Sequence, residues 1–294
     1  MRQTSPNLSR RNLLRALAAS PVAAGAATFP LAARAEASSA ATAAGLITPN
    51  VCLVMPEVTE GPYYIDPNLV RADIAEDRTG IPLVLQMQVV NADCTPIEGA
   101  RVDVWHCDAE GNYSGYANQG SEATLDTTGQ TFLRGTQMTE AGGLVQFQTI
   151  YPGWYRGRTT HIHYKVFLDE VTVLTSQIFF PDALSQYLYD NIAPYTREST
   201  RDTINASDGI AHQAGDGAYA ALREQSDGYV AQLVVGVNPD AVSEAGNGGP
   251  GGSGGGAGGP NGAPPGPPPG DAGGMGPSGS GDWTPDDLVP EKDS

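Results

Sequence analysis

The central part of the chain alternates between hydrophobic and polar residues in short runs. Alternation with a period of two places successive side chains on opposite faces of a β-strand. Asp, Asn, Gly and Pro, which favour turns, separate most of these runs. We therefore predict strands over residues 82–91, 100–107, 132–139, 144–150, 161–168, 173–180 and 229–237. Many short strands and few helical stretches indicate an all-β protein of the β-sandwich type.

The stretch after Pro181 has a different character. Residues 183–189 and 194–203 are expected to form short helical or irregular pieces. The run at 229–237 is the last strand of the predicted sandwich.

The N-terminal end of the chain does not follow this strand pattern. Residues 9–14, Ser-Arg-Arg-Asn-Leu-Leu, are typical of a twin-arginine export signal, and a small-x-small cleavage site follows at residues 33–35. Prolines and polar residues break the apolar run short of the roughly 20 residues that a membrane span needs, so we expect no membrane anchor. The alternative interpretation is a disordered basic tail before an apolar helix. The signal predicts a periplasmic or extracellular protein.

The C-terminal end is low in complexity. Residues 246–281 are almost entirely Gly, Pro, Ser, Ala and Asn, and such a segment buries too little surface to offset the entropy lost on ordering. We therefore expect it to be disordered. The predicted organisation is a signal peptide at 1–35, a linker at 36–50, a β-sandwich domain at 51–240 and a Gly/Pro-rich tail at 241–294.

Charge and cysteine content narrow the class of protein. The chain has 33 acidic and 16 basic residues and a formal net charge of −17, which argues against nucleic acid as a partner. Its three cysteines, Cys52, Cys94 and Cys107, lack the C-x-x-C spacing of a thiolate metal site. An exported protein could form one disulfide and keep one free thiol, with a pairing that the sequence leaves open. We expect structural roles for all three.

Two of the four histidines carry the strongest functional signal. His161 and His163 form a His-x-His pair on a predicted strand, which places both on one face about 7 Å apart along the chain. Two such imidazoles can converge on one metal ion. His106 lies on the apolar face of a predicted strand, where a packed, hydrogen-bonded histidine is expected. His212 lies in a polar stretch and is expected to be an exposed loop residue.

Two tyrosines are the best-placed oxygen donors near this pair. Tyr155 precedes His161 by six residues, and Tyr113 follows a predicted strand-end turn. A phenol has a pKa near 10, so only a strongly Lewis-acidic metal keeps it deprotonated at neutral pH. Fe(III) does so, whereas Zn(II), Cu(II) and Fe(II) more often bind carboxylate, imidazole or thiolate. The spacing alone leaves a zinc site, a copper site or a purely structural strand as alternatives.

Several segments together resemble the intradiol ring-cleavage dioxygenases, a family that includes catechol 1,2-, hydroxyquinol and protocatechuate 3,4-dioxygenases. The resemblance covers about residues 50 to 185 and follows the order of the family. The segments that carry it are Thr-Glu-Gly-Pro-Tyr-Tyr at 59–64, Val-Asp-Val-Trp-His-Cys-Asp-Ala-Glu-Gly-Asn-Tyr at 102–113, Phe-Leu-Arg-Gly at 132–135, and Pro-Gly-Trp-Tyr at 152–155 through His-Ile-His at 161–163.

The resemblance implies a ferric centre. Its ligands would be Tyr113, Tyr155, His161 and His163. Tyr155 would be the tyrosinate that leaves when substrate binds, and Tyr113 would stay bound. The family fold, an all-β sandwich, agrees with the strand pattern.

The resemblance also implies a substrate pocket and a reaction. Arg158 and Gln177 would stabilise charge that develops on the aromatic ring, and Pro62 and Tyr63 would lie over the pocket. The implied partners are a small aromatic diol of the catechol type and O2, with no external reductant. The product would be a diacid of the cis,cis-muconate type. A homo-oligomer is compatible with the resemblance.

Some features depart from the family pattern. The better-known catechol and protocatechuate enzymes have longer inserts between the residues matching Tyr155 and His161, so their specificity does not transfer. Residues 36–50 are too few for the helical dimerisation domain of catechol 1,2-dioxygenases. Two alternatives to the enzyme stay open: a non-catalytic β-sandwich of the transthyretin-like or carbohydrate-associated kind, and a zinc or copper protein of unrelated activity.

Overall fold

The structure, a computed structural model, describes residue 47 and residues 52–66, 68–120 and 123–244. The predicted signal peptide, nearly all of the linker and the Gly/Pro-rich tail lie outside the described residues. Within the described part, no helix combines the length and the apolar character needed to cross a membrane.

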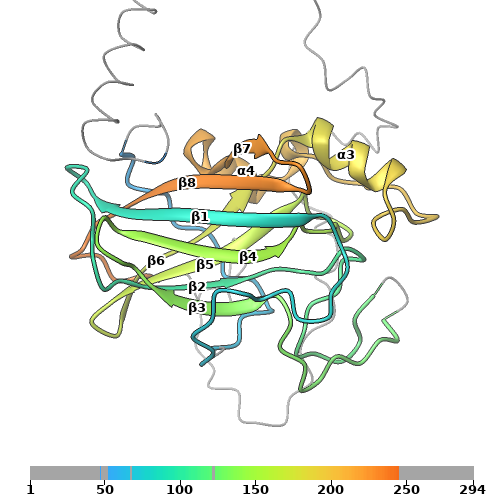
Figure 1. Cartoon of the computed structure of the whole chain (residues 1–294), viewed down its shortest axis with the longest axis horizontal. Coiled ribbons are helices and arrows are strands. Elements are labelled where there is room, and N and C mark those ends of the chain that lie inside the picture. Colours follow the sequence, from blue (N-terminus) through green and yellow to red (C-terminus); the bar gives the residue numbers. More distant parts are fainter. Residues whose placement is uncertain (1–46, 48–51, 67, 121–122, 245–294) are drawn as a thin grey trace, which may run out of the picture. The chain divides into compact units, whose positions relative to one another are not determined.

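Two four-stranded sheets form a β-sandwich (Figure 1). The first has the order β4-β1-β8-β7, and the second has the order β3-β2-β5-β6. Neighbouring strands are antiparallel except β1 and β8, which are parallel. The strands are β1 (Pro82–Asn91), β2 (Arg101–Trp105), β3 (Arg134–Met138), β4 (Leu144–Ile150), β5 (His161–Leu168), β6 (Val171–Phe179), β7 (Ala221–Glu224) and β8 (Tyr229–Val237). The all-β sandwich prediction is confirmed.

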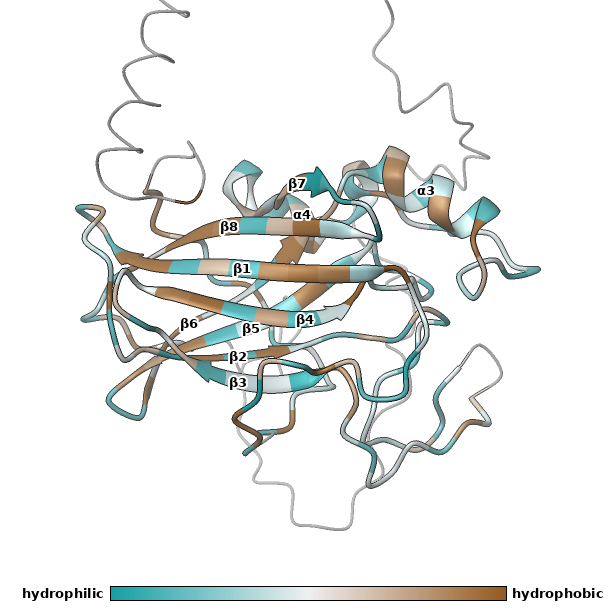
Figure 2. Cartoon of the chain, viewed as in Figure 1, coloured by the Kyte–Doolittle hydropathy of each residue, from teal (hydrophilic) through white to brown (hydrophobic). Residues whose placement is uncertain are grey.

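The core lies between the sheets and is built from alternating strand positions. In β1, Leu83, Leu85 and Met87 are fully buried while the residues between them are partly exposed. Val102 and Val104 of β2 belong to the same hydrophobic cluster, so both sheets contribute to it (Figure 2). Each such side chain contributes on the order of 2 kcal/mol to stability. The predicted alternation therefore sets the buried face in the first part of β1 and in β4, whereas most of β5 and β6 is buried on both faces.

One strand and one helix differ from the sequence prediction. β7 pairs with β8 at the edge of the first sheet, but three of its four residues are exposed, so no hydrophobic pattern marks it. His212 is exposed, as expected, but it lies on a short helix rather than in a loop. In the part of the chain that the structure describes, the helical elements all follow β6. They are α3 (Asp182–Asn191), η1 (Asn205–Ser207), α4 (Gly209–Ala214) and η2 (Asp216–Ala218).

A disulfide ties the N-terminal segment to the sandwich. Cys52 pairs with Cys94, with their Cα atoms 5.3 Å apart, and Cys94 lies in the turn between β1 and β2. Cys107 is a free, buried thiol. The structural role expected for the cysteines agrees with this arrangement.

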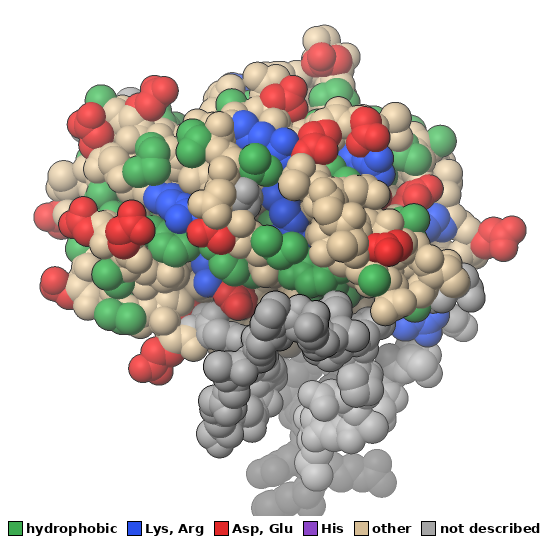
Figure 3. Space-filling view, turned by 90° about the horizontal axis from the view of Figure 1, so that it is seen from below, with side chains coloured by type: hydrophobic (Ala, Val, Ile, Leu, Met, Phe, Trp, Pro, Cys, Tyr) green, Lys and Arg blue, Asp and Glu red, His purple; other side chains and the backbone are tan. Residues whose placement is uncertain are grey.

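Acidic residues dominate the charged surface. Figure 3 shows one face of the molecule, on which acidic side chains stand out around the rim and basic side chains form small separate groups. This distribution matches the excess of acidic residues in the whole chain.

Candidate metal centre

The His-x-His pair lies on β5, between β2 and β6 of the second sheet. His161 and His163 share one face of the strand, and both side chains are buried. Their rings tilt toward each other, which brings the two Nε2 atoms to 3.0 Å. This is much closer than the spacing along the strand, so the pair converges on one point as predicted.

Both predicted tyrosines reach the same point. The Tyr155 hydroxyl lies 3.2 Å from His161 Nε2, and the Tyr113 hydroxyl lies 3.4 Å from the same atom. Tyr113 comes from the loop after β2, and Tyr155 from the connection between β4 and β5. Two phenol oxygens and two imidazole nitrogens from three parts of the chain therefore meet in one small volume.

Neighbouring groups fix the two imidazole rings. His161 Nδ1 lies 2.6 Å from the Thr159 carbonyl, so Nδ1 donates and the Nε2 lone pair faces the cluster. The ring of His163 stacks on Trp105, with centroids 4.9 Å apart and planes 10° from parallel. This stack follows from strand register, because Trp105 of β2 lies opposite His163. His163 Nδ1 is buried and has no hydrogen-bond partner among the described residues.

Burial sets the protonation of the cluster. It lowers the pKa of His161, with Arg158 adding to the effect, and it lowers the pKa of His163, with His161 adding. Both imidazoles are therefore neutral at neutral pH and offer lone pairs. Burial also raises the pKa of Tyr113 and Tyr155, although Arg158 opposes this at Tyr155. Only a strong local cation would hold these phenols as phenolates.

The donor set fits a hard, highly charged ion. Among the described residues, no group of three or more His, Cys, Asp or Glu side chains is placed to hold a metal. A metal bound to His161 and His163 would therefore take its remaining protein donors from the two phenols. Phenolate oxygen with imidazole nitrogen suits Fe(III) better than the softer or less acidic divalent ions.

Arg158 and Gln177 stand beside this cluster and contact each other. Arg158 Nη2 donates to Gln177 Oε1 at 2.5 Å, and Arg158 Nη1 lies 3.4 Å from His161 Nε2. Gln177, opposite His163 on β6, donates through Nε2 to the Thr59 carbonyl at 2.9 Å. Both predicted residues thus lie at the site, and Arg158 Nε is held by the Asp208 carboxylate at 2.9 Å.

Sequence reasoning missed Asp208. Its carboxylate is buried, yet its pKa is low because the Arg158 charge and hydrogen bonds outweigh the effect of burial. The local signal was a helix N-cap before Gly209, which indicates a structural role only. Its contact with Arg158 joins residues 50 apart in sequence and has no local signature.

The segment with Pro62 and Tyr63 covers the cluster. A Cβ on Gly61 would come within 3.4 Å of His163 Cε1, so the backbone passes close to the imidazole. Tyr63 is buried and stacks on Tyr113, with ring centroids 4.3 Å apart and planes 15° from parallel. Pro62, between them, is half-buried. The placement agrees with the prediction that this segment lies over the pocket.

A second unpredicted residue, Arg134, hydrogen-bonds to segments on both sides of the Tyr63–Tyr113 stack. Its buried guanidinium donates to the Tyr63 carbonyl at 2.6 Å, to the Ser114 carbonyl at 2.7 Å and to Ser114 Oγ at 2.9 Å. Ser114 follows Tyr113 directly. The Arg134 side chain therefore links Tyr63 to Ser114, the residue that follows its stacking partner Tyr113.

His106 and His212 lie apart from the four donors. The His106 ring bridges the Cys107 carbonyl and Thr149 Oγ1, at 2.8 and 2.7 Å, and burial lowers its pKa to about 4. It is a neutral, packed histidine, as predicted. Neither residue contacts the Tyr-His cluster.

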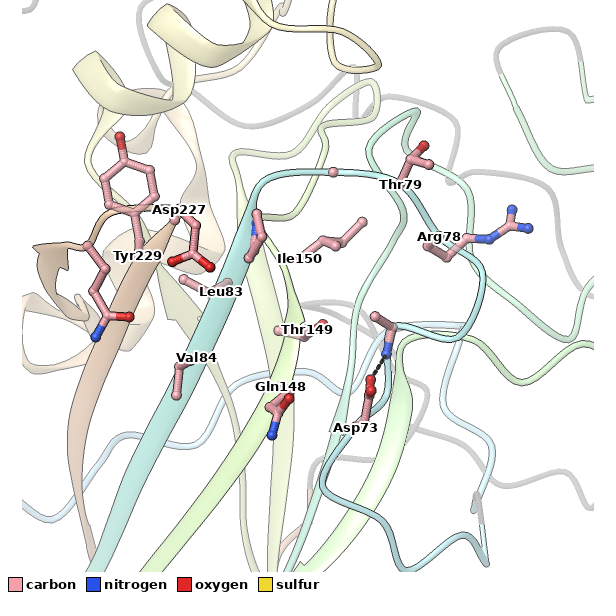
Figure 4. A pocket seen from close by; sticks show the side chains of 15 residues that line it. Asp73, Arg78, Thr79, Leu83, Val84, Gln148, Thr149, Ile150, Asp227 and Tyr229 are labelled. Atoms are coloured by element: carbon pink, nitrogen blue, oxygen red, sulfur yellow. Dashed lines mark hydrogen bonds between the residues drawn. The ribbon is translucent and has the colours of Figure 1, made fainter.

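A hollow of about 490 Å³ lies elsewhere, at one end of the first sheet. Figure 4 shows its wall, which includes Asp73, Arg78, Asp227 and Tyr229 around the starts of β1 and β8 and the end of β4. None of the four converging donors lines it. The chemistry therefore points to the Tyr-His cluster and not to this hollow.

Residues 58–216 match a protein family described as Dioxygenase, a match that spans more than half of the chain. The chain belongs to the intradiol dioxygenase family. Enzymes of this family use iron. The resemblance seen in the sequence motifs is confirmed at the level of the family.

Two curated relatives show the range of similarity. The chain is 29% identical over 213 residues to catechol 1,2-dioxygenase of Acinetobacter baylyi, which covers 64% of this chain and 65% of that one. It is 34% identical over 135 residues to the protocatechuate 3,4-dioxygenase beta chain of Burkholderia cepacia, which covers 42% and 55%. The chain spans between half and two thirds of the length of these relatives.

A solved structure is similar over a larger share of its length. The intradiol ring-cleavage dioxygenase from Tetranychus urticae is 35% identical, has a TM-score of 0.61, and matches 67% of this chain and 100% of its own. The sandwich of this protein is therefore the intradiol dioxygenase fold.

Proposed function

We propose that this protein is a non-haem, Fe(III)-dependent enzyme that uses O2 to cleave a catechol-type ring between its two hydroxyl-bearing carbons. The product would be a cis,cis-muconate-type diacid. One observation carries the proposal: the hydroxyls of Tyr113 and Tyr155 and the Nε2 atom of His163 all lie within 3.4 Å of His161 Nε2. Membership of a ring-cleaving family supports it.

The protein would bind substrate by exchanging one ligand. Bound Fe(III) supplies the Lewis acidity that keeps phenolates and a catechol dianion stable at neutral pH. Tyr113, Tyr155, His161 and His163 would hold the ion, and the Tyr155 phenolate Oη would accept a proton from a substrate hydroxyl. Tyr113, His161 and His163 would stay in place, because each is buried and fixed by a neighbouring group.

Other side chains would orient the ring and stabilise charge on it. Arg158 holds a cation beside His161, and Gln177 shares a hydrogen bond with it. A fixed guanidinium next to the ring would stabilise negative charge as a ring oxygen becomes carbonyl-like. Tyr63, Trp105 and Tyr113 form a buried aromatic cluster, which would limit access of water to the ring.

Colour and oxygen uptake test the proposal. The purified, iron-loaded protein should be wine-red from tyrosinate-to-Fe(III) charge transfer and should consume one O2 per catechol ring cleaved. His161→Ala should lose both properties. The matched control is His212→Ala, since His212 is exposed on α4 and should be dispensable.

Two outcomes would overturn this assignment. A colourless protein with full metal occupancy would favour the zinc or copper alternative, and metal analysis would identify the ion. A red protein that consumes no O2 with any of a panel of substituted catechols would favour a non-catalytic binding protein.

We also propose that the protein is exported by the twin-arginine route. The signal at residues 9–14 motivates this proposal, and the disulfide between Cys52 and Cys94 supports it, because disulfides persist mainly in oxidising compartments. Replacing Arg10 and Arg11 by lysine should leave the protein in the cytoplasm on cell fractionation. The control Arg2→Lys should be exported normally, and export of the double-lysine variant would contradict the proposal.

A further inference from the structure

The Asp208 carboxylate joins two parts of the molecule. It is 3% exposed and accepts four hydrogen bonds. Oδ2 accepts from Arg158 Nε and from the Thr159 backbone N–H, both at 2.9 Å. Oδ1 accepts from the backbone N–H groups of Ile210 and Ala211, at 2.8 and 3.1 Å. One oxygen therefore faces the metal centre, and the other caps α4.

The two oxygens of the Asp208 carboxylate have different roles. The Oδ1 bonds satisfy backbone donors at the start of α4, which any small N-cap side chain can do. The Oδ2 bonds hold a guanidinium, whose side chain is 13% exposed, by a charged, directional contact, which needs a carboxylate of this length. Because α4 contacts β6 and η1, the cap keeps the carboxylate in place against residues 158 and 159, just before β5 begins.

This contact decides where Arg158 points. Its Nη2 reaches Gln177 and its Nη1 reaches His161, so all three sides of the guanidinium are occupied. Without Asp208, Nε would lose its carboxylate partner, and the side chain could rotate away from β6. The Thr159 peptide would also lose an anchor two residues before His161.

We propose that Asp208 is a positioning residue, which holds the Arg158 guanidinium beside the metal centre in the orientation needed for ring cleavage. The proposal rests on the proposed function. It assigns to Asp208 no contact with the substrate or the metal.

The decisive variant is Asp208→Ser. Serine can still cap α4 but is too short to reach Arg158 Nε, so the helix is kept and the contact is lost. A hydrogen bond to a charged group is commonly worth a 10- to 100-fold change, so kcat per bound iron should fall by roughly that factor. Iron content should stay near that of the unmodified protein. Asp208→Asn keeps the shape of the side chain but not its charge. Its kcat per bound iron should lie between those of the unmodified protein and Asp208→Ser.

A double-mutant cycle separates positioning from a general structural effect. Arg158→Met alone should lower kcat at least as much as Asp208→Ser, and the double variant should be no slower than Arg158→Met. The proposal would be overturned if the fold-loss in kcat of the double variant equalled the product of the two single fold-losses. Two residues that act independently combine in that way. The control is Asp182→Asn, which weakens another carboxylate–arginine pair, with Arg201, in the same region. It should leave kcat within twofold.

A second readout does not depend on activity. In the metal-free full-length protein, the Arg158 Nε–H should give a slowly exchanging NMR signal, assigned by its loss in Arg158→Met. Asp208→Ser should abolish that protection, and Asp182→Asn should keep it. Unchanged protection in Asp208→Ser would overturn the proposal. An inactive, colourless unmodified protein would instead overturn the proposed function, while the exchange measurement would still decide whether Asp208 fixes Arg158.

Discussion

The two tyrosines of the candidate metal centre sit in contrasting surroundings. Tyr113 is 1% exposed and lies face to face with Tyr63. Its backbone N–H donates to Gln119, and its carbonyl accepts from Thr127. Its neighbour Ser114 is held by Arg134. The ring, the backbone and the next residue are therefore all fixed.

Tyr155 is half-buried and has only edge contacts with other rings. The next two residues, Arg156 and Gly157, are exposed, and Gly157 has a φ of +82°, which favours glycine. No side chain stacks on the Tyr155 ring among the described residues. We therefore expect the Tyr155 ring to be easier to displace than the Tyr113 ring.

Under the proposed function, this difference would let one residue type serve two roles in one site. A phenol that is packed on its face and tied at its backbone behaves as a permanent ligand. A phenol that is held at its edge, next to an exposed turn, can be exchanged for substrate. The surroundings, rather than the chemistry of the side chain, assign the roles.

The largest effect should come from the fixed tyrosine. Tyr113→Phe removes a donor that no neighbour can replace, so iron binding, colour and ring cleavage should all be lost. Visible absorbance, iron analysis and oxygen uptake measure these. Tyr116→Phe is the matched control, because it removes only a hydroxyl that donates to the Tyr64 carbonyl. A red, active Tyr113→Phe would contradict the assignment of Tyr113 as the permanent ligand.

Tyr155→Phe should be milder. The remaining three donors should retain iron with altered colour, while loss of the proton acceptor should lower kcat by about 100-fold. Single-turnover oxygen uptake and the visible spectrum before and after catechol addition would show this. If this variant loses iron while Tyr113→Phe keeps it, the roles of the two tyrosines are reversed.

Arg134→Met tests how the fixed side is held. Loss of three hydrogen bonds leaves carbonyl acceptors buried and unpaired, so the free energy of unfolding should drop by about 3 kcal/mol. Activity per bound iron should drop by roughly 10-fold, as for other supporting contacts in metal sites. Urea denaturation and oxygen uptake measure the two. The exposed control Arg223→Met on β7 should change the unfolding free energy by less than about 0.5 kcal/mol.

The smallest effect on activity should come from the disulfide. The double variant Cys52→Ser/Cys94→Ser should lower the free energy of unfolding by about 2–4 kcal/mol, because it frees the segment before Tyr63 in the unfolded chain. Activity per bound iron should stay within twofold, since Arg134 still holds Tyr63. A large loss of activity at full stability would show that the disulfide itself positions Tyr63. Thermal melts with and without reductant compare the two effects.

Local patterns predicted the parts of the molecule whose causes are local. The strands β1, β5 and β8 begin and end where their alternation does. The His-x-His spacing alone placed two donors on one face, because the pleat of a strand has a fixed period. Tyr113 and Tyr155 could be named because Tyr113 follows a turn after β2, Tyr155 shortly precedes β5, and the family resemblance implies both as ligands.

Other features depend on contacts between distant parts of the chain. Arg134 meets Tyr63 across 71 residues, and Asp208 meets Arg158 across 50. Neither contact leaves a local pattern. β7 was missed because an edge strand with exposed residues needs no hydrophobic alternation. The supporting residues, rather than the donors, are what sequence reasoning could not find.

The position of β5 has a consequence for how a metal would be kept. β5 is paired on both sides, with β2 and with β6, so His161 and His163 cannot separate without breaking the sheet. We expect an ion held there to leave past the segment that carries Tyr155, because the next two residues are exposed. Under the proposed function, the same segment yields to substrate. A faster turnover would therefore come with weaker retention of iron. A more mobile Tyr155 segment would admit substrate faster and would also shorten the residence time of the ion.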